Sequence, residues 1–313
     1  MITVKPGKLN KGDLIGVVSP ASSIADSSRI ESGVRYLERL GYSVRVGDHV
    51  GKVHGYLAGD DADRLSDLQG MFTDTRVKAV VCIRGGYGTS RLLSWINYRL
   101  VARNPKILVG FSDITALQLA LLRRCGLITF HGPMLGVEMA NTIDPFTEEM
   151  FWILVSSTTK IGKVAFPASS SLISLHGGRA VGRLIGGNLS MMTTLMGTHF
   201  LPDMRGSVLC IEEIDEEPYR IDRMLTHLRN AAVLDKVSAI IAGQFTDCLP
   251  KDSSKPSLTV EEVLAESAKR LAKPFLANLP FGHIPLKVTL PIGLKVRVDA
   301  DAGAMEFLEA AVR

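Results

Sequence analysis

The chain has 313 residues, of which 46% are hydrophobic and 22% charged, and its formal net charge is +4. This composition is typical of soluble globular proteins and excludes a disordered or fibrous chain, and the length suits two domains of about 150 residues or one large α/β unit. Because the sequence has no block of five or six basic residues, only 6% aromatic residues and no apolar run of 18 residues, we expect no nucleic-acid partner and no membrane span.

The first half of the chain alternates strand and helix patterns. Strand patterns cover residues 13–19, 77–83, 106–111 and 127–130, and helix patterns cover residues 28–40, 90–96 and 113–124. Near-continuous Val, Ile and Leu runs between helices predict a mostly parallel sheet covered on both faces, as in a doubly wound α/β domain. In such sheets ligands bind at the carboxyl ends of strands. We therefore expect function where Ser19, Arg84 and Phe111 leave their strands.

Residues 157–178 are rich in Ser, Thr and Gly and show no sustained helical period. We place a linker there, between an N-terminal domain of residues 1–156 and a C-terminal domain of residues 179–313. The second half has strand patterns at residues 183–185, 208–211 and 239–242, helix patterns at residues 189–196, 220–228 and 260–271, and a predicted hairpin at residues 294–308. This order predicts a C-terminal α/β domain with a mostly β end.

Four cysteines, Cys82, Cys125, Cys210 and Cys248, lie far apart and mostly within apolar runs. Without a Cys-x-x-Cys pair, a zinc ribbon, a redox dithiol and a disulfide scaffold are disfavoured. Buried free thiols in a reducing compartment are the simpler interpretation. Residues 1–11 carry basic side chains but no apolar segment follows them, so we expect no signal peptide and a cytoplasmic protein.

A glycine-rich segment, Arg84-Gly85-Gly86-Tyr87-Gly88, joins a predicted strand to a predicted helix. Its glycines let the backbone approach a ligand closely and leave N–H groups free to point at an anion. The segment lacks the Lys-Ser/Thr of a phosphate-binding Walker loop and fits the dinucleotide fingerprint badly. A tight turn and an anion or oxyanion site both remain open.

The segment Gly110-Phe111-Ser112-Asp113 also joins a strand to a helix. A serine at such a turn projects its hydroxyl above the sheet, and the next N–H lies at a helix N-terminus, as in a nucleophile elbow. The usual second glycine is replaced by Ile114. The alternative is that Ser112 or Asp113 only caps the helix.

A serine nucleophile needs a base, and the base needs an orienting carboxylate. Among the seven histidines, His283 lies in a loop crowded by Gly and Pro, and His131, directly after a predicted strand, competes with it. The other five are interpreted as solvated or incidental: His49, His54, His176, His199 and His227.

Residues 212–217 hold five carboxylates. Pro218 suits the first turn of the next helix, whose positive end favours acids before it. We expect Glu213, Asp215, Glu216 and Glu217 to act in this way. Glu212 directly follows a buried-type strand, where its carboxylate can accept a hydrogen bond from an imidazole. Paired-carboxylate glycosidase chemistry stays open as an alternative.

Six ordered motifs carry a resemblance to a known family. They are GDLIGVVSPAS, RGGYG, GFSDIT, IGGNLSMMTTLMGT, EEIDEEPYRIDRML and LPFGHIPLKVTLPIG, and they extend from about Pro6 to Val298. With them the chain resembles the L,D-carboxypeptidases, serine peptidases of the muramoyl-tetrapeptide carboxypeptidase type, a group that includes microcin C7 self-immunity proteins.

The resemblance implies a Ser-Glu-His triad at Ser112, Glu212 and His283, between the two domains. It implies an oxyanion hole from the backbone N–H groups of Gly86 and Asp113, with Gly85 as the alternative to Gly86. The expected reaction is hydrolysis of the amide between meso-diaminopimelate (or Lys) and terminal D-Ala in murein tetrapeptides, during cell-wall recycling. No metal or organic cofactor is implied, and a homodimer is expected by analogy.

Two other functions are compatible with these motifs. One is a microcin-immunity-type amidase that cleaves an acyl-sulfamoyl or acyl-phosphoramidate adenylate. Such an enzyme needs an aromatic surface for adenine, and the two tryptophans, Trp95 and Trp152, lie outside obvious loops. The other is a catalytically silent protein that binds ligands in the same cleft.

Overall fold

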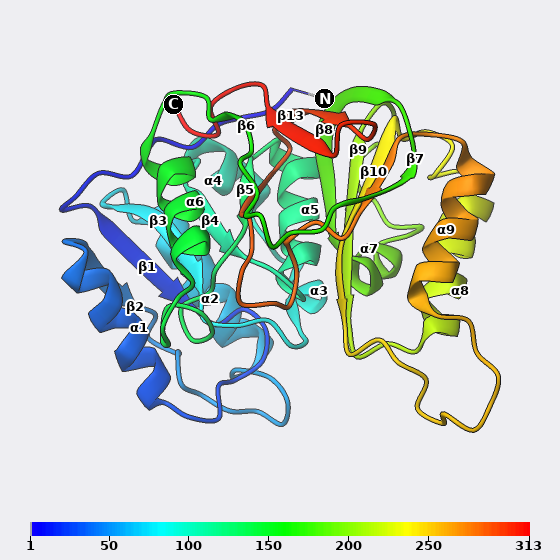
Figure 1. Cartoon of the computed structure of the whole chain (residues 1–313). Coiled ribbons are helices and arrows are strands. Elements are labelled where there is room, and N and C mark those ends of the chain that lie inside the picture. Colours follow the sequence, from blue (N-terminus) through cyan, green and yellow to red (C-terminus); the bar gives the residue numbers. More distant parts are fainter. Residues whose placement is uncertain (1) are drawn as a thin grey trace.

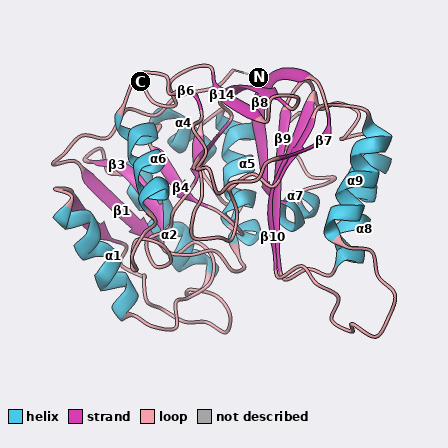
Figure 2. Ribbon diagram, viewed as in Figure 1, coloured by secondary structure: helices cyan, strands magenta, loops and turns pink. Residues whose placement is uncertain are grey.

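A computed structural model describes residues 2–313 and arranges them around two β-sheets, one of six strands and one of eight (Figure 1). Each sheet has parallel central strands and helices packed against it (Figure 2). The two-domain α/β class expected from the sequence is confirmed. Residue 1, the first of the predicted N-terminal domain, lies outside the described residues.

The six-stranded sheet has the order β12-β5-β4-β3-β1-β2. Its strands are β1 (Leu14–Val18), β2 (Ser43–Val46), β3 (Val77–Cys82), β4 (Ile107–Gly110), β5 (Thr129–His131) and β12 (Leu290–Ile292). All pairings are parallel except that of β12 with β5. The order 2-1-3-4-5 is that of flavodoxin-like folds, which bind ligands where the winding direction reverses, between β1 and β3.

Helices cover both faces of this sheet because the chain winds first one way and then the other with right-handed crossovers. They are α1 (Ser28–Arg39), α2 (Asp61–Thr73), α3 (Thr89–Leu92), α4 (Tyr98–Arg103), α5 (Ile114–Cys125) and α6 (Pro145–Ser156). Helix α1 packs beside α6, where the Tyr36 hydroxyl donates to Glu148 over 2.7 Å. On the other face, α4 contacts both α2 and α5. Of the predicted helix at residues 90–96, only the short α3 forms.

The eight-stranded sheet has the order β6-β14-β13-β8-β9-β10-β11-β7. Its strands are β6 (Gly162–Lys163), β7 (Ile173–His176), β8 (Arg179–Asn188), β9 (Val208–Ile214), β10 (Ala239–Thr246), β11 (Phe275–Ala277), β13 (Lys295–Asp299) and β14 (Ala304–Phe307), and its helices are α7 (Leu189–Thr194), α8 (Pro218–Asn230) and α9 (Val260–Leu271). Strands β8 to β11 are parallel, and β13 and β14 form the expected antiparallel hairpin.

Helix α5 joins the two sheets. Its residues from Ile114 to Leu122 are all buried, and it contacts β4 and β5 of one sheet and β8 of the other (Figure 1). A helix buried all round is typical of the interior of a larger protein. The apolar core is correspondingly continuous between the two sheets, so the carboxyl ends of β4 and β9 are held in fixed relative positions.

Residues 157–178, where we placed the linker, carry the short strands β6 and β7. These strands add to the edges of the eight-stranded sheet by pairing with β14 and β11, and β12 returns to the six-stranded sheet. The domain boundaries stay a prediction.

Cys82, Cys210 and Cys248 are buried free thiols, whereas free Cys125 is partly exposed. Within residues 2–313, every helix is too short or too polar to span a bilayer.

Candidate active site

Ser112 occupies the turn between β4 and α5 and has a positive φ of 63°. A non-glycine residue rarely adopts this conformation, which costs energy and is typical of functional turns. The start of α5 has no side-chain cap, so the capping alternative is wrong. The Asp113 carboxylate instead accepts a hydrogen bond from the Thr89 N–H over 2.9 Å, and burial raises its pKa. The turn thus presents the Ser112 side chain as a nucleophile elbow does.

The glycine-rich loop after β3 passes directly over Ser112. A Cβ added to Gly85 would lie 2.8 Å from the Ser112 Cβ and 3.0 Å from its Oγ. Both distances are too short for ordinary contact, so only glycine permits this approach. The glycine at position 85 is therefore explained by the close approach of the loop to Ser112.

Ser22 fixes the orientation of this loop. Its N–H donates to the Gly85 carbonyl over 3.3 Å, and its Oγ accepts from the Tyr87 N–H over 3.0 Å. Since C=O and N–H point in opposite directions across a trans peptide, the Gly86 N–H points away from Ser22. Within residues 2–313 neither this N–H nor that of Asp113 has a protein acceptor.

Glu212 and His283 form a hydrogen-bonded pair. Glu212 lies on β9 with its side chain fully buried, and its Oε2 is 2.7 Å from the His283 Nδ1. Gly282 precedes the histidine with a φ of 112°, and a Cβ there would lie 3.0 Å from the same Oε2. The Phe111 ring packs edge-on against the imidazole, with 5.0 Å between centroids. The imidazole is therefore held on two sides.

One cavity brings Ser112 and His283 together. Its volume is about 300 Å³, and its walls include Gly85, Gly86 and Phe111. A second cavity of about 390 Å³ shares Phe111 and His283 with it and is also lined by Glu138 and Lys287. His283 therefore borders both cavities, while its Nδ1 is hydrogen-bonded to Glu212.

His131, the competing base, lies in the interior. It is 1% exposed, does not line the cavity of Ser112 and His283, and packs between Phe111 and Phe281 at centroid distances of 5.5 and 6.1 Å. Burial lowers its pKa to about 4. Within the described part of the chain, neither ring nitrogen has a hydrogen-bond partner.

The expectation that Glu213 lies at the solvated start of the next helix is wrong. Strand β9 extends beyond Ile211 to Ile214, so Glu212 and Glu213 point to opposite faces. Glu213 is buried and accepts hydrogen bonds from Asn188 Nδ2 (2.7 Å) and the Ser190 N–H (2.8 Å) at the start of α7. Burial raises its pKa. The two glutamates therefore do not form a pair facing one cleft, as a glycosidase needs.

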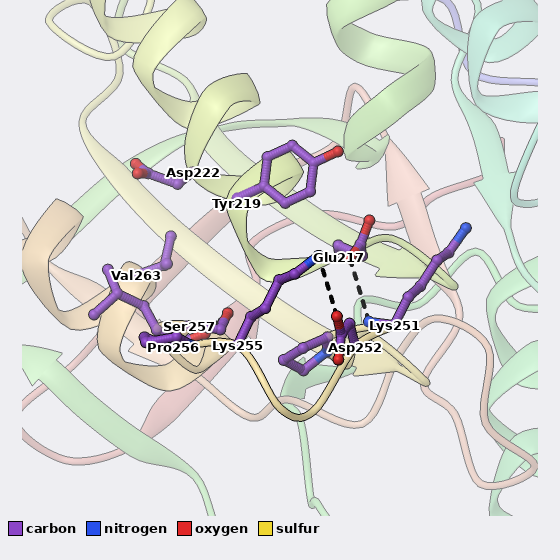
Figure 3. Close-up of a pocket in the computed structure, with 11 residues that line it drawn as sticks. Glu217, Tyr219, Asp222, Lys251, Asp252, Lys255, Pro256, Ser257 and Val263 are labelled. Carbon is purple, nitrogen blue, oxygen red and sulfur yellow. Dashed lines mark hydrogen bonds and ion pairs between the residues drawn. The ribbon is translucent and has the colours of Figure 1, made fainter.

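The remaining acids do lie near the start of α8, which begins at Pro218 as expected. Glu216 pairs with Arg220 at 3.6 Å, and Glu217 accepts a hydrogen bond from the Lys251 N–H. A cavity of about 620 Å³ opens here and is lined by Glu217, Tyr219 and Lys255 (Figure 3). None of the candidate catalytic residues borders it.

Two further expectations, about the five remaining histidines and about the tryptophans, have different outcomes. His49 is not incidental, because its ring nitrogens lie 2.7 Å from Asp67 and 3.1 Å from Asp63. Trp152 stacks on Tyr42 within the α1–α6 layer. Trp95 is exposed and lies in the turn between α3 and α4, so the expectation that both tryptophans lie outside loops is wrong for Trp95. Neither tryptophan borders the two cavities at His283.

Sequence comparison matches residues 15–132 to the LD-carboxypeptidase N-terminal domain and residues 181–298 to the LD-carboxypeptidase C-terminal domain. The probable murein peptide carboxypeptidase of Bacillus subtilis is 40% identical over 99% of this chain and 96% of its own.

Solved structures agree with this. The microcin C7 self immunity protein MccF in complex with aspartyl sulfamoyl adenosine has a TM-score of 0.90 at 27% identity and covers 99% of this chain and 100% of its own. Muramoyltetrapeptide carboxypeptidase from Oxalobacter formigenes has a TM-score of 0.81 at 31% identity, covering 94% of this chain and 97% of its own. Because matches span both halves of the chain, the protein belongs to the Peptidase S66 family of LD-carboxypeptidases.

Proposed function

We propose that this chain is a serine-type L,D-carboxypeptidase that releases the terminal D-Ala of murein tetrapeptides. The proposal depends on one observation: Ser112, at a strained turn, and His283, which is hydrogen-bonded to Glu212, line the same cavity. The name of the Bacillus subtilis relative supports a murein peptide as substrate.

In this mechanism the Ser112 Oγ attacks the carbonyl carbon of the peptide bond before D-Ala. His283 takes the hydroxyl proton on Nε2 and later gives it to the leaving amine. Glu212, bonded to Nδ1, holds the tautomer that leaves Nε2 free to accept the proton, and it stabilises the imidazolium. Water then hydrolyses the acyl-enzyme by the same sequence of proton transfers.

The developing oxyanion needs donors that are already in place. We assign this role to the N–H groups of Gly86 and Asp113, which have no protein acceptor within residues 2–313. The Asp113 N–H follows the nucleophile at the start of α5, where the helix dipole favours negative charge. The orientation imposed by Ser22 supports Gly86 over Gly85.

Hydrolysis of an acyl nucleotide is the second candidate, because the MccF structure bound to aspartyl sulfamoyl adenosine has the same fold. Against it, neither tryptophan borders the cavities at His283. A catalytically silent binding protein would not need the backbone strain at Ser112.

The four free cysteines support the further expectation of a cytoplasmic enzyme in cell-wall recycling. Light scattering would test the expected homodimer.

The deciding experiment is incubation of the protein with a murein tetrapeptide and measurement of free D-Ala. Wild type should release D-Ala, and Ser112→Ala should be slower by about 10⁴-fold or more. Ser90→Ala, a serine on the nearby α3, is the matched control and should keep wild-type activity. Acyl-sulfamoyl adenosine is the competing substrate. Cleavage of that compound without D-Ala release would reject the carboxypeptidase assignment.

A further inference from the structure

Two arginines line the cavity that holds Ser112 and His283. Arg84 stands between the end of β3 and the glycine-rich loop, and Arg29 comes from the first turn of α1. Both side chains are partly buried. Neither has a role in the proton transfers proposed above.

Backbone carbonyls hold both guanidinium groups in place. The Arg29 Nε donates to the Gly136 carbonyl over 2.8 Å and its Nη2 to the Val137 carbonyl over 3.3 Å. The Arg84 Nη1 donates to the Ser23 carbonyl over 3.3 Å. These acceptors are neutral, so the bonds fix the two side chains without cancelling their charge.

No carboxylate of residues 2–313 forms an ion pair with either guanidinium. Asp26 is the acid that Arg29 influences, but the pKa of Asp26 is lowered mainly by its hydrogen bonds with Ser28. The neighbouring cavity differs, because its cation, Lys287, is 2.5 Å from Glu138. Of the two cavities that share His283, the one with Ser112 therefore carries uncompensated positive charge among the described residues.

We propose that Arg84, assisted by Arg29, binds the terminal carboxylate of the substrate, an assignment that rests on the carboxypeptidase function proposed above. A guanidinium matches a carboxylate through two parallel hydrogen bonds. In a C-terminal residue the carboxylate is separated from the scissile nitrogen by one carbon atom. A carboxylate reader must therefore lie beside the nucleophile, as the cavity lining places Arg84.

The placement of Arg84 has a consequence for specificity. The residue directly precedes Gly85 and Gly86, so the carboxylate contact and the proposed oxyanion donor belong to one loop fixed by Ser22. Binding of a free carboxylate then aligns the scissile carbonyl with its donors. An amidated terminus lacks the negative charge that Arg84 binds. The enzyme should therefore act as an exopeptidase that requires a free C-terminal carboxylate.

The test is a cycle of variants and substrates. Release of D-Ala from the free tetrapeptide is compared with release of D-alaninamide from the C-terminally amidated peptide, by wild type, Arg84→Gln and Arg29→Gln. Wild type should prefer the free acid by about 100-fold in kcat/KM, because loss of one partner of a desolvated charge pair has effects of this order. In Arg84→Gln, kcat/KM should fall by about 100-fold for the free peptide and by less than about threefold for the amidated peptide.

Arg29→Gln should show the same pattern with a smaller loss, about tenfold, because two of its donors are already bonded to carbonyls. Arg35→Gln is the matched control, since Arg35 is exposed on the same helix and pairs with Glu31. Labelling of Ser112 by a fluorophosphonate at the wild-type rate would show that each variant keeps its nucleophile.

Equal losses on acid and amide would overturn the assignment and make Arg84 a support of the loop only. Loss by Arg84→Gln on acyl-sulfamoyl adenosine but not on the tetrapeptide would assign the charge to a phosphate-like group instead. If wild type releases D-Ala from neither peptide, the proposed function itself has failed, and the subsite falls with it.

Discussion

The two sheets contribute to the active site in different ways. The six-stranded sheet supplies backbone geometry, with a positive φ at Ser112 and glycines that let the loop after β3 approach it. The eight-stranded sheet and the loop that follows it supply a hydrogen-bonded side-chain pair, Glu212 and His283. The first contribution depends on residues that are adjacent in the chain or at strand ends. The second depends on packing between distant segments, which α5 stabilises by joining the sheets.

The largest expected effect separates the neighbouring glutamates of β9. Glu212→Gln removes the charge that stabilises the imidazolium and can stabilise the wrong tautomer, so kcat should fall by about 10³–10⁴-fold. Glu213→Gln should keep kcat within severalfold but lose about 1–3 kcal/mol of stability, because an amide cannot accept the three hydrogen bonds that Glu213 receives. Turnover rates and urea unfolding of both variants measure this difference.

Glu217→Gln, at the partly buried start of α8, is the control for both variants and should change stability by only about 0.3–1 kcal/mol. The opposite outcome, with Glu213→Gln inactive and Glu212→Gln active, would mean that the acid is assigned to the wrong face of β9.

Substitution of Gly85 tests the backbone contribution. Gly85→Ala places a Cβ 2.8 Å from that of Ser112, so the loop and the nucleophile must move apart. A displacement of about 1 Å can reduce turnover by about 100-fold. Gly7→Ala, where the new Cβ meets nothing within 4 Å, should leave kcat unchanged. Wild-type kcat in Gly85→Ala would show that the close approach has no part in catalysis.

Buried His131 provides a smaller effect that concerns stability. Because burial lowers its pKa to about 4, the folded state binds fewer protons than the unfolded state, whose histidine titrates near pH 6.5. Stability should therefore decrease as the pH falls from about 6.5 to about 4, by at most about 1.4 kcal/mol per pH unit. His131→Phe should flatten this dependence in urea unfolding at several pH values.

Ser90→Ala, which removes no titratable group, is the control for that experiment and should keep the wild-type pH slope. An unchanged slope in His131→Phe would mean that His131 has the same pKa in the folded and unfolded states. Turnover within about tenfold of wild type in His131→Phe would also remove it as the competing base.

Local sequence patterns predicted much of the fold and part of the site. The runs of Val, Ile and Leu predicted β3, β4 and β9, and the glycines and Ser112 lie at strand ends because tight turns require such residues. The sequence predicted that β9 ends at Ile211, three residues before its end in the structure. The charged residues Glu212 and Glu213 interrupt the apolar pattern, although both are buried within the strand. For the same reason, the prediction that Glu213 lies at the solvated start of α8 was wrong.

Other features have no local signal. Strands β6, β7 and β12 are short, and their partners lie far away in the chain, so tertiary contacts rather than propensity determine them. In the sequence, Arg29 resembles any surface arginine of an amphipathic helix. It lines the cavity because the loop that holds Gly136 and Val137 passes beside it and bonds its guanidinium group.

The central claim is that Ser112 of one sheet and the His283–Glu212 pair of the other act as one catalytic unit. Reaction with a fluorophosphonate followed by peptide mass spectrometry tests this most directly. We predict a single adduct on Ser112 in wild type and strongly slowed labelling in His283→Gln and Glu212→Gln, both still folded. An adduct on another residue, or equal labelling rates in all three proteins, would contradict the claim.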